Sequence, residues 1–444
     1  MDGKLTGTPV PAEFADRMGS ILGDELPAFL QALEEPPCRG IRLNPLKKTG
    51  AAARYERGER IPWAEGAFLL DGASQAGATV LHEAGAFYLQ EPGAMIPAAV
   101  LDARPGERVL DLCAAPGGKT TQIGCAMRGQ GLLVANEPVQ KRAQILSRNV
   151  ERMGIGNAVV TCAWPEQLSS RWPEVFDAVL ADAPCSGEGM FRRVPESRVE
   201  WTREKAAGCA ERQRVILGEA AKMVRPGGRL VYSTCTYNPE ENEENVRWFL
   251  SCHPDFEPAA FSLPGVDAPE GLFTCYPHRM KGEGQFTALF RRKGGGDPGS
   301  PGKSTLPAPS KEETAVFRKE FPTLPVPNLR FSSLLARLES CPDLSGIRVL
   351  RVGLHLGEIR GKVAVPDHAA ALSADPPSVP AVDMTAEEAC RWLAGETLNR
   401  DAAGWILTRW QGLAVGWGKG SEGVVRNHYP KGLRGSHFLA EENG

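Results

Sequence analysis

The chain has 444 residues, of which 42% are hydrophobic and 24% are charged, and its 51 Lys and Arg against 54 Asp and Glu give a formal net charge of −3. This length exceeds one ordinary core and predicts two or three domains. A membrane span and a secretion signal are not expected, since the chain has neither a run of 18 apolar residues nor a basic-then-apolar N-terminus, and a cytoplasmic protein is expected.

The cysteine pattern and the net charge limit which kinds of metal, disulfide and polyanion-binding sites can be expected. Eleven cysteines without any C-x-x-C pair or Cys/His cluster predict reduced thiols, with neither a disulfide framework nor a metal site. Because the net charge is slightly negative, a polyanion would have to be bound by local basic patches.

Residues 1–95 are expected to form a region with both helix and strand. Apolar residues recur at helical spacing between residues 12 and 33, and "CRGIRLNPLKK" predicts a short strand and a turn. Between Arg39 and Arg60, seven Lys or Arg stand against two Glu. This stretch is either a solvated face or a surface for a polyanion.

Strands and helices alternate over residues 96–292. The expected strands are "RVLDLCA", "GLLVANE", "AVVTCA", "FDAVLADAP" and "RLVYSTCTY", with helices such as "VQKRAQILSRNVERMG" between them. This rhythm predicts an α/β fold with a parallel sheet covered on both faces and right-handed crossovers. "NPEENEENVRWFLSCH" is predicted to be a helix capped by Asn238, with Pro239 at its first position.

"VLDLCAAPGGKT" predicts a strand, a loop of small residues and a helix start. Gly117 and Gly118 would let the backbone approach a ligand, and the helix N-terminus offers N–H groups to an anion. The next strand ends in Glu137, where a ribose diol would lie. A site for a single nucleoside favours S-adenosylmethionine over NAD, and a purely structural strand–helix turn is the alternative.

Polar side chains follow the ends of several expected strands. Glu137, Asp182, Cys185 and Cys235 should therefore converge on the "APGGK" loop, because ligands of open α/β sheets bind at the carboxyl ends of strands. A thiolate beside a methyl-sulfonium suits methylation of carbon 5 of cytosine, since addition of sulfur to carbon 6 makes carbon 5 nucleophilic. Asp182 would bind the cytosine edge. For each cysteine the alternative is a small buried hydrophobe, as Cys125 is expected to be.

Residues 293–313 have the Gly, Pro and Ser content of a flexible linker, and residues 314–444 are expected to form a separate α+β unit. Its tail combines basic and aromatic residues, a mixture that suits phosphate contacts and stacking on bases, although a small β core is the alternative for the tryptophans. These residues are Trp417, Lys419, Arg426, His428, Tyr429, Lys431 and Arg434.

Three stretches resemble motifs of the Sun-type RNA (cytosine-5)-methyltransferases: "DLCAAPGGKT", "ADAPCSGEGMFRR" and "YSTCTYNPEENEENV". With the flanking "FYLQEPGAMIPAAVLDARPGERVLD" and "YPHRMKGEGQFTALFRRK", the resemblance covers roughly residues 38–292. "RVGLHLGEIRGKVAVPDHAAAL" and "GKGSEGVVRNHYPKGLR" resemble the C-terminal portion of the RsmF branch, which modifies small-subunit ribosomal RNA.

This resemblance implies a domain plan. Residues 96–292 would form a Rossmann-like, seven-stranded class I methyltransferase core. Residues 1–95 would be an N-terminal α+β RNA-binding extension, and residues 314–444 a C-terminal PUA-like RNA-binding domain. The implied partner is ribosomal RNA or the small ribosomal subunit, with no membrane and no metal, and the protein is expected to be a monomer.

The resemblance also implies residue roles. Cys235 would attack cytosine and Cys185 would assist product release, whereas DNA cytosine methyltransferases use the cysteine equivalent to Cys185 as nucleophile. The S-adenosylmethionine site would comprise Cys113, Ala114, Ala115, Pro116, Gly117, Gly118, Lys119, Glu137 and Asp182. The same chemistry on tRNA, or a non-catalytic RNA-binding ribosome-assembly factor, remains an alternative.

The sequence departs from the family at the third strand of the core. Many relatives place an Asp there to hydrogen-bond the adenine amine, whereas this chain has "VVTCAWPEQL". Trp164 cannot replace a carboxylate, so adenine would be held by backbone contacts or by stacking. Trp164 is therefore not among the predicted site residues.

Overall fold

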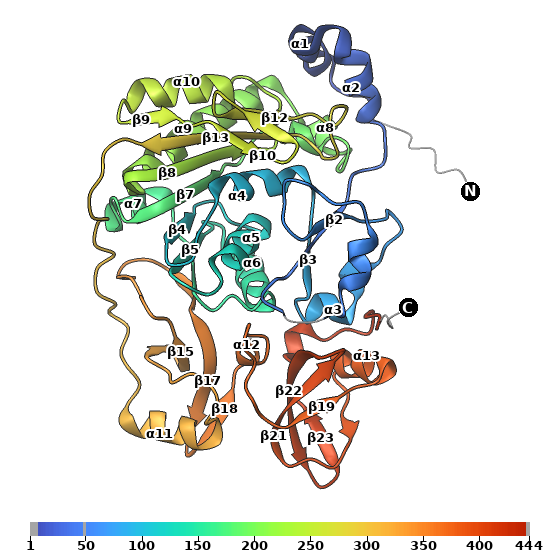
Figure 1. Ribbon diagram of the computed structural model, residues 1–444, viewed down its shortest axis with the longest axis vertical. Coiled ribbons are helices and arrows are strands. Elements are labelled where there is room, and N and C mark those ends of the chain that lie inside the picture. Colours follow the sequence, from blue (N-terminus) through green and yellow to red (C-terminus); the bar gives the residue numbers. More distant parts are fainter. Residues whose placement is uncertain (1–7, 48–49, 441–444) are drawn as a thin grey trace.

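The computed structural model describes residues 8–47 and 50–440. The chain forms an N-terminal region, a central region built on one large sheet, and a C-terminal region that lies below the first two in Figure 1.

The N-terminal region joins a helical pair to a small antiparallel sheet of order β2-β1-β3. The helical prediction for residues 12–33 is confirmed with one break, at Gly23 (φ 54°), after which a 3-10 turn leads into the second helix. The elements are α1 Ala12–Leu22, α2 Leu26–Ala32, β1 Gly40–Leu43, β2 Ala67–Leu69, α3 Val80–Glu83 and β3 Phe87–Gln90.

The central region confirms the predicted strand–helix alternation. Its elements are α4 Ile96–Leu101, β4 Arg108–Asp111, α5 Gly118–Met127, β5 Leu132–Asn136, α6 Gln140–Arg152, β6 Ala158–Thr161, α7 Pro165–Arg171, β7 Phe176–Asp182, α8 Ser197–Glu200, α9 Arg203–Met223, β8 Val224–Thr234, α10 Glu243–Cys252, β9 Phe256–Pro258, β10 Phe261–Leu263, β11 Val266–Ala268, β12 Leu272–Cys275 and β13 Gln285–Arg292.

Seven strands of the central sheet follow the order β12-β13-β8-β7-β4-β5-β6, with β13 antiparallel to its neighbours. This is the seven-stranded, Rossmann-like methyltransferase arrangement. The sheet reaches nine strands because β9 pairs with β13, and β16 (Val349–Val352), from the C-terminal region, pairs antiparallel with β6.

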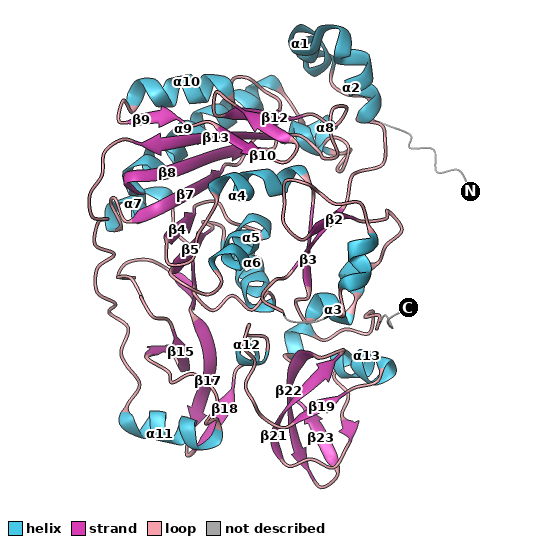
Figure 2. Ribbon diagram, viewed as in Figure 1, coloured by secondary structure: helices cyan, strands magenta, loops and turns pink. Residues whose placement is uncertain are grey.

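Alternate residues of each strand pack on opposite faces, as the two-residue period requires. Leu110, Val134 and Val179 face a core completed by α7, α9 and α10. Val109, Leu133 and Leu180 face a second core completed by α4, α5 and α6. Figure 2 shows the helices distributed around the sheet. Both faces are therefore closed, and the strand ends are left for a site.

The predicted helix start at Asn238 and Pro239 is wrong, since α10 begins at Glu243 with Asn242 before it. The side chain of Asn242 is used elsewhere: its Oδ1 accepts from Thr234 Oγ1 at 2.6 Å and its Nδ2 donates to the Thr236 carbonyl at 2.9 Å. These bonds hold the intervening segment as a compact turn at the end of β8.

The C-terminal region holds a four-stranded sheet of order β14-β15-β17-β18 and a five-stranded sheet of order β19-β21-β22-β23-β20. Its other elements are α11 Lys311–Glu320, β14 Leu329–Phe331, β15 Leu334–Arg337, β17 Leu354–Arg360, β18 Val363–Pro366, α12 His368–Ala371, β19 Ala381–Asp383, α13 Ala386–Ala394, β20 Leu398–Asn399, β21 Gly404–Trp410, β22 Leu413–Ser421 and β23 Val424–Asn427. Between β13 and α11 the chain has no regular element, and the amide of Gly299 donates to the Glu174 carbonyl at 2.8 Å.

Two aromatic residues expected to stack on bases lie in the core. Trp417 is 1% exposed and donates through Nε1 to the Asp367 carbonyl, and Tyr429 is 2% exposed and donates to Glu83 Oε2 at 3.0 Å. The stacking role is therefore wrong for Tyr429, whereas for Trp417 the alternative, a small β core, is confirmed. Instead, Tyr429 joins the C-terminal region to α3 of the N-terminal region.

Two basic residues of the stretch from Arg39 to Arg60 are used inside the fold. Arg42 is 3% exposed, and Lys47 donates to the Leu372 carbonyl, where burial lowers the pKa of Lys47 to about 7.

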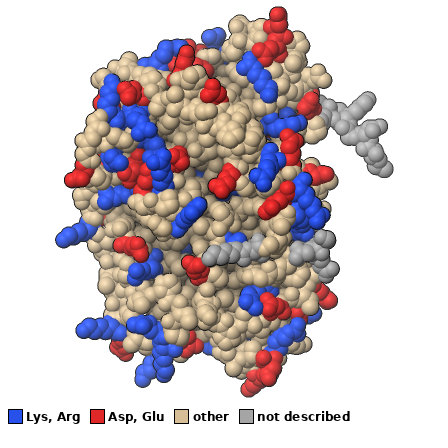
Figure 3. Space-filling model, in the orientation of Figure 1, with Lys and Arg blue, Asp and Glu red and all other residues tan. Residues whose placement is uncertain are grey.

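On the face drawn in Figure 3, basic and acidic side chains are interspersed. Within the described residues, no helix has the length and apolar content needed to cross a bilayer.

A buried ionic cluster joins α6 to the C-terminal region. Glu151 accepts from Arg351 of β16, and its Oε1 lies 2.9 Å from His368 Nδ1 at the start of α12. Burial alone would raise the pKa of Glu151, but Arg351 and His368 lower it to about 2. The Glu151 carboxylate thus connects three elements: α6, β16 and α12.

Glu151→Gln is expected to lower the free energy of unfolding by about 3 kcal/mol near neutral pH, because Arg351 would lose its buried counter-ion. Stabilisation by an acid with a depressed pKa is complete above its unfolded value of about 4.5 and disappears as pH falls toward 2. The deficit, measured by urea unfolding, should therefore shrink below about pH 4.5. Glu396→Gln, at an exposed pair with Arg391, is the control and should change stability by less than about 1 kcal/mol. An equal loss in both variants would contradict this role.

Candidate active site

The thiols of Cys185 and Cys235 meet at the carboxyl edge of the central sheet. β7 and β8 pair in parallel with Asp182 opposite Ser233, so the loops that follow these residues leave the sheet side by side. The two sulfur atoms are 3.1 Å apart, and the backbone N–H of Cys235 donates to Cys185 Sγ at 3.3 Å. Both residues are half-buried.

The surroundings of Cys185 oppose the ionisation of its thiol. The hydrogen bond with Cys235 and then burial raise the pKa of Cys185 well above its ordinary value. Cys185 therefore holds its proton and can donate it in a hydrogen bond to the sulfur of Cys235.

An ion pair lies beside the thiols. Lys119 Nζ donates to Asp182 Oδ2 at 2.8 Å, and Asp182 Oδ1 accepts from Ser233 Oγ at 2.6 Å. Burial opposes a charge on Lys119, but Asp182 and Cys235 raise the pKa of its ammonium above the ordinary value. The positive charge of Lys119 thus lies close to both Asp182 and Cys235.

A buried carboxylate fixes the two cysteine loops to each other. Glu241 is fully buried, and its Oε2 accepts from the Ser186 N–H at 3.0 Å and from Gln213 Nε2 at 2.8 Å. Gln213 also donates to the Pro184 carbonyl at 3.0 Å, and Ser186 Oγ lies 2.8 Å from Thr236 Oγ1. The distance between the thiols is thus set by side chains on both sides of the pair.

The loop after β4 has the predicted form. Gly117 has φ 115°, and a Cβ there would lie 3.2 Å from Leu146 Cδ1, so this position favours glycine. Helix α6 holds the loop in place, since Arg142 donates to the Ala115 carbonyl at 3.0 Å and Asn149 to that of Pro116 at 2.8 Å.

A cavity of about 190 Å³ lies against this loop. Strand β3 supplies the opposite wall with Tyr88 and Gln90. The cavity brings together all but two of the residues predicted for the cofactor: Cys113, Ala114, Ala115, Pro116, Gly118, Lys119 and Asp182 line it.

Gly117 and Glu137 lie outside the cavity lining. Glu137 follows β5, is 2% exposed, and accepts from the Val139 N–H at 3.0 Å and from Arg142 Nη1 at 3.2 Å. Arg142 contacts both Glu137 and Ala115, so this carboxylate lies next to the loop rather than inside the cavity.

Asp111 was not predicted as a site residue, although it lines this cavity. It ends β4 and is 1% exposed; its Oδ2 accepts from Thr120 Oγ1 at 2.6 Å, and its Oδ1 has no hydrogen-bond partner among the described residues. Burial raises the pKa of Asp111 to about 7. An acidic residue within the apolar run "VLDLC" was the available sequence signal.

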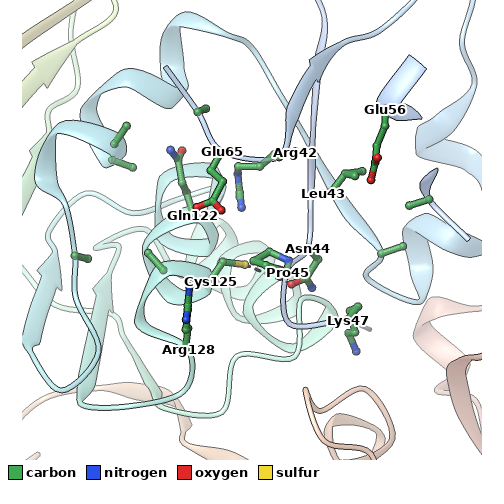
Figure 4. Close-up of a pocket in the computed structure, with 18 of the residues that line it drawn as sticks. Arg42, Leu43, Asn44, Pro45, Lys47, Glu56, Glu65, Gln122, Cys125 and Arg128 are labelled. Carbon is green, nitrogen blue, oxygen red and sulfur yellow. Dashed lines mark hydrogen bonds between the residues drawn. The ribbon is translucent and has the colours of Figure 1, made fainter. Parts of the chain in front are cut away.

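A second cavity, of about 490 Å³, separates the N-terminal region from α4 and α5. Figure 4 shows Arg42, Glu65, Gln122 and Cys125 around the same space. None of the predicted site residues lines it, and Cys125 is buried as expected. Arg42 donates to Thr121 Oγ1 at 2.8 Å, so this side of α5 is anchored to β1.

In the described part of the chain, no group of three or more His, Cys, Asp or Glu side chains is placed to hold a metal ion.

Comparison with known families matches four segments of the chain. The family described as 16S rRNA methyltransferase RsmB/F matches residues 98–291, and the N-terminal domain of 16S rRNA methyltransferase RsmF matches residues 10–92. The RsmF rRNA methyltransferase first C-terminal domain matches residues 317–373, and the methyltransferase RsmF PUA domain matches residues 379–435.

Whole-chain relatives and solved structures agree with these matches. Ribosomal RNA small subunit methyltransferase F of Escherichia coli O127:H6 is 34% identical over 91% of this chain and 92% of its own length, and that of Escherichia fergusonii is 32% identical over the same shares. A methyltransferase homologue from Pyrococcus horikoshii is 30% identical, with a TM-score of 0.55 over 63% of this chain and 94% of its own. NSun6 from Pyrococcus horikoshii shares the fold at 20% identity, with a TM-score of 0.54 over 65% of this chain and 99% of its own.

Asp111→Asn is expected to make the unliganded protein more stable relative to the wild type as pH rises. Between about pH 4 and pH 7 the unfolded chain ionises Asp111 while the folded chain keeps it protonated, so stability of the wild type falls over this range. The variant should gain about 4 kcal/mol relative to the wild type across that window, measured by urea unfolding. Asp383→Asn, at an exposed pair with Arg409, is the control. A difference that does not change with pH would contradict the raised pKa.

Proposed function

Because this chain belongs to the family of ribosomal RNA small subunit methyltransferase F, we propose that it transfers a methyl group from S-adenosylmethionine to carbon 5 of a cytosine in small-subunit ribosomal RNA, through a covalent bond to Cys235. Family membership makes the chain an rRNA methyltransferase. The position on the base, the methyl donor and the covalent route are proposed from the site itself.

The pair of thiols carries this proposal. Carbon 5 of cytosine is a poor nucleophile, and an enzyme that methylates it must first supply electrons to the ring. Cys235, which lies beside the Cys185 thiol and near the Lys119 ammonium, would form as its thiolate a bond to carbon 6 and push electron density onto carbon 5. Asp182, held by Lys119 and Ser233, would accept a hydrogen bond from the exocyclic amine of the base.

Product release requires the reverse arrangement. After methylation, the proton on carbon 5 leaves, the bond between carbon 6 and sulfur breaks, and Cys235 returns to the thiolate. Cys185, 3.1 Å from the leaving sulfur, would donate its proton in a hydrogen bond to the departing thiolate, and the proton of carbon 5 would pass to water. A second thiol at this distance supports a route in which the adduct must be opened again.

The residues at the loop after β4 fit a cofactor that carries an amino acid and a nucleoside. The unpartnered Oδ1 of Asp111 would accept from an ammonium group in the 190 Å³ cavity, and Glu137 would bind a ribose diol at the end of β5. S-adenosylmethionine, when bound, supplies an electrophilic methyl group on a sulfonium. Its binding should weaken below about pH 7, where Asp111 is protonated.

The target base must leave its stack in the RNA before it can react, and this unstacking costs a few kcal/mol. The match to a PUA domain at residues 379–435 supports extra RNA-binding surface in the C-terminal region. There, Lys419, Arg426, His428 and Lys431 are exposed, whereas Arg434 is committed to the Tyr429 carbonyl at 3.1 Å. The exposed group would supply the phosphate contacts.

Cys235→Ala is expected to reduce methyl transfer by about 10³-fold or more, because the variant lacks the sulfur that would add to carbon 6 and activate carbon 5. RNA binding should persist. Labelled S-adenosylmethionine with small-subunit RNA measures the transfer, bisulfite sequencing locates it, and Cys252→Ala, at an exposed thiol, is the control. Methylation by Cys235→Ala would overturn the covalent route, and wild-type RNA binding without any transfer would favour an assembly factor.

Cys185→Ala is expected to form the bond to RNA and fail to release it. The variant should therefore accumulate a protein–RNA adduct that survives denaturing electrophoresis, and the double variant with Cys235→Ala should form none. Normal turnover by Cys185→Ala, without an adduct, would remove Cys185 from the release step.

A further inference from the structure

Trp164 places a large apolar side chain in solvent between the carboxyl end of β6 and α7, outside the lining of the 190 Å³ cavity. It stands three residues after the last residue of β6, and 63% of it is exposed. Every other Trp that packs in a core of this fold is far more buried; Trp172, at the end of the next helix, is fully buried. The exposure of Trp164 is therefore not explained by packing of the free protein.

The loop that carries Trp164 is joined to the loop that carries Glu137. Strands β5 and β6 pair in parallel with Asn136 opposite Thr161. The amide of Asn136 bonds both backbone groups of Ala163, donating at 2.9 Å and accepting at 3.1 Å. These bonds tie the loop that carries Trp164 to the end of β5, where Glu137 is proposed to bind the ribose.

A second apolar side chain comes from the neighbouring loop. Val139 follows Glu137 by two residues and is 49% exposed, and the Cys162 thiol donates to the Pro138 carbonyl at 3.4 Å, which joins the two loops again. Two exposed apolar residues thus stand on the joined loops next to Glu137.

The backbone N–H and carbonyl of Trp164 already have hydrogen-bond partners. The backbone N–H of Trp164 donates to Gln167 Oε1 at 2.9 Å, and its carbonyl accepts from the Gln167 N–H at 3.0 Å. The carboxylate nearest in sequence, Glu166, lies exposed in the first turn of α7. The loop therefore offers a base an aromatic face in place of a fixed acceptor.

We propose that Trp164 forms one wall of the base subsite of the cofactor, where the purine stacks on the indole and its 6-amino group is not recognised by a carboxylate. This inference rests on the proposed use of S-adenosylmethionine. Stacking tolerates changes at the edge of a base, because every base has a π face. A buried acceptor would instead reject a base that lacks the matching donor.

The test compares two ligands that differ at one group: S-adenosylhomocysteine and its 6-oxo analogue S-inosylhomocysteine, with affinities measured by calorimetry. The wild type is expected to bind the two within about threefold of each other. Trp164→Ala should bind both about tenfold more weakly, and Trp164→Phe, which keeps an aromatic face, should retain most of the affinity. Trp164→Asp should favour the adenosyl ligand, because it restores an acceptor for the amine.

Three results would overturn the proposal: a wild-type preference of more than about tenfold for the adenosyl ligand, unchanged affinity in Trp164→Ala, or a preference that disappears in Glu166→Gln. The last result would assign recognition of the amine to Glu166. Two other results would contradict the proposed function itself. They are an absence of S-adenosylhomocysteine binding by the wild type, and methyl transfer by Cys235→Ala. Circular dichroism and thermal unfolding of each variant confirm that the fold is retained.

Discussion

The parallel pairing of β7 with β8 is the contact on which the site depends. It sets Asp182 opposite Ser233, so two segments that are remote in sequence leave the sheet at the same height and bring Cys185 to Cys235. The apolar alternation of these strands between two cores makes a slip by one residue costly, because every buried side chain would change face. The register that stabilises the core is thus the same register that aligns the thiols.

The surroundings of the thiols combine rigidity with opposed charges. Glu241 and Gln213 fix the loops from below, while Lys119 and Asp182 form a polar wall beside the sulfur atoms. Burial strengthens each of these interactions, since the local dielectric is low. Two chemically identical side chains thereby lie in different surroundings, which is the condition for giving them different tasks.

Much of this arrangement follows from local patterns. Short apolar runs bounded by Gly and Pro predicted the strands, and the rule that sites form at strand ends placed Asp182, Cys185 and Cys235 together. The start of α10 could not be predicted in this way, because Asn242 is bonded to Thr234 and Thr236 instead of acting alone as a cap. Burial of Tyr429 likewise depends on Glu83, more than 300 residues earlier in the chain. Asp111 was overlooked because its unsatisfied oxygen is a property of three-dimensional packing.

Strand β16 has a consequence for how the molecule can be divided. By pairing with β6 it covers what would otherwise be an open sheet edge, and the carbonyl of Arg348, just before it, accepts from the Cys162 N–H at 2.8 Å. An excised catalytic fragment ending at residue 292 would expose that edge to edge-to-edge self-association. It would also loosen the support beneath Trp164. The C-terminal region is therefore a structural component of the catalytic core, and the two cannot be treated as interchangeable modules joined by a tether.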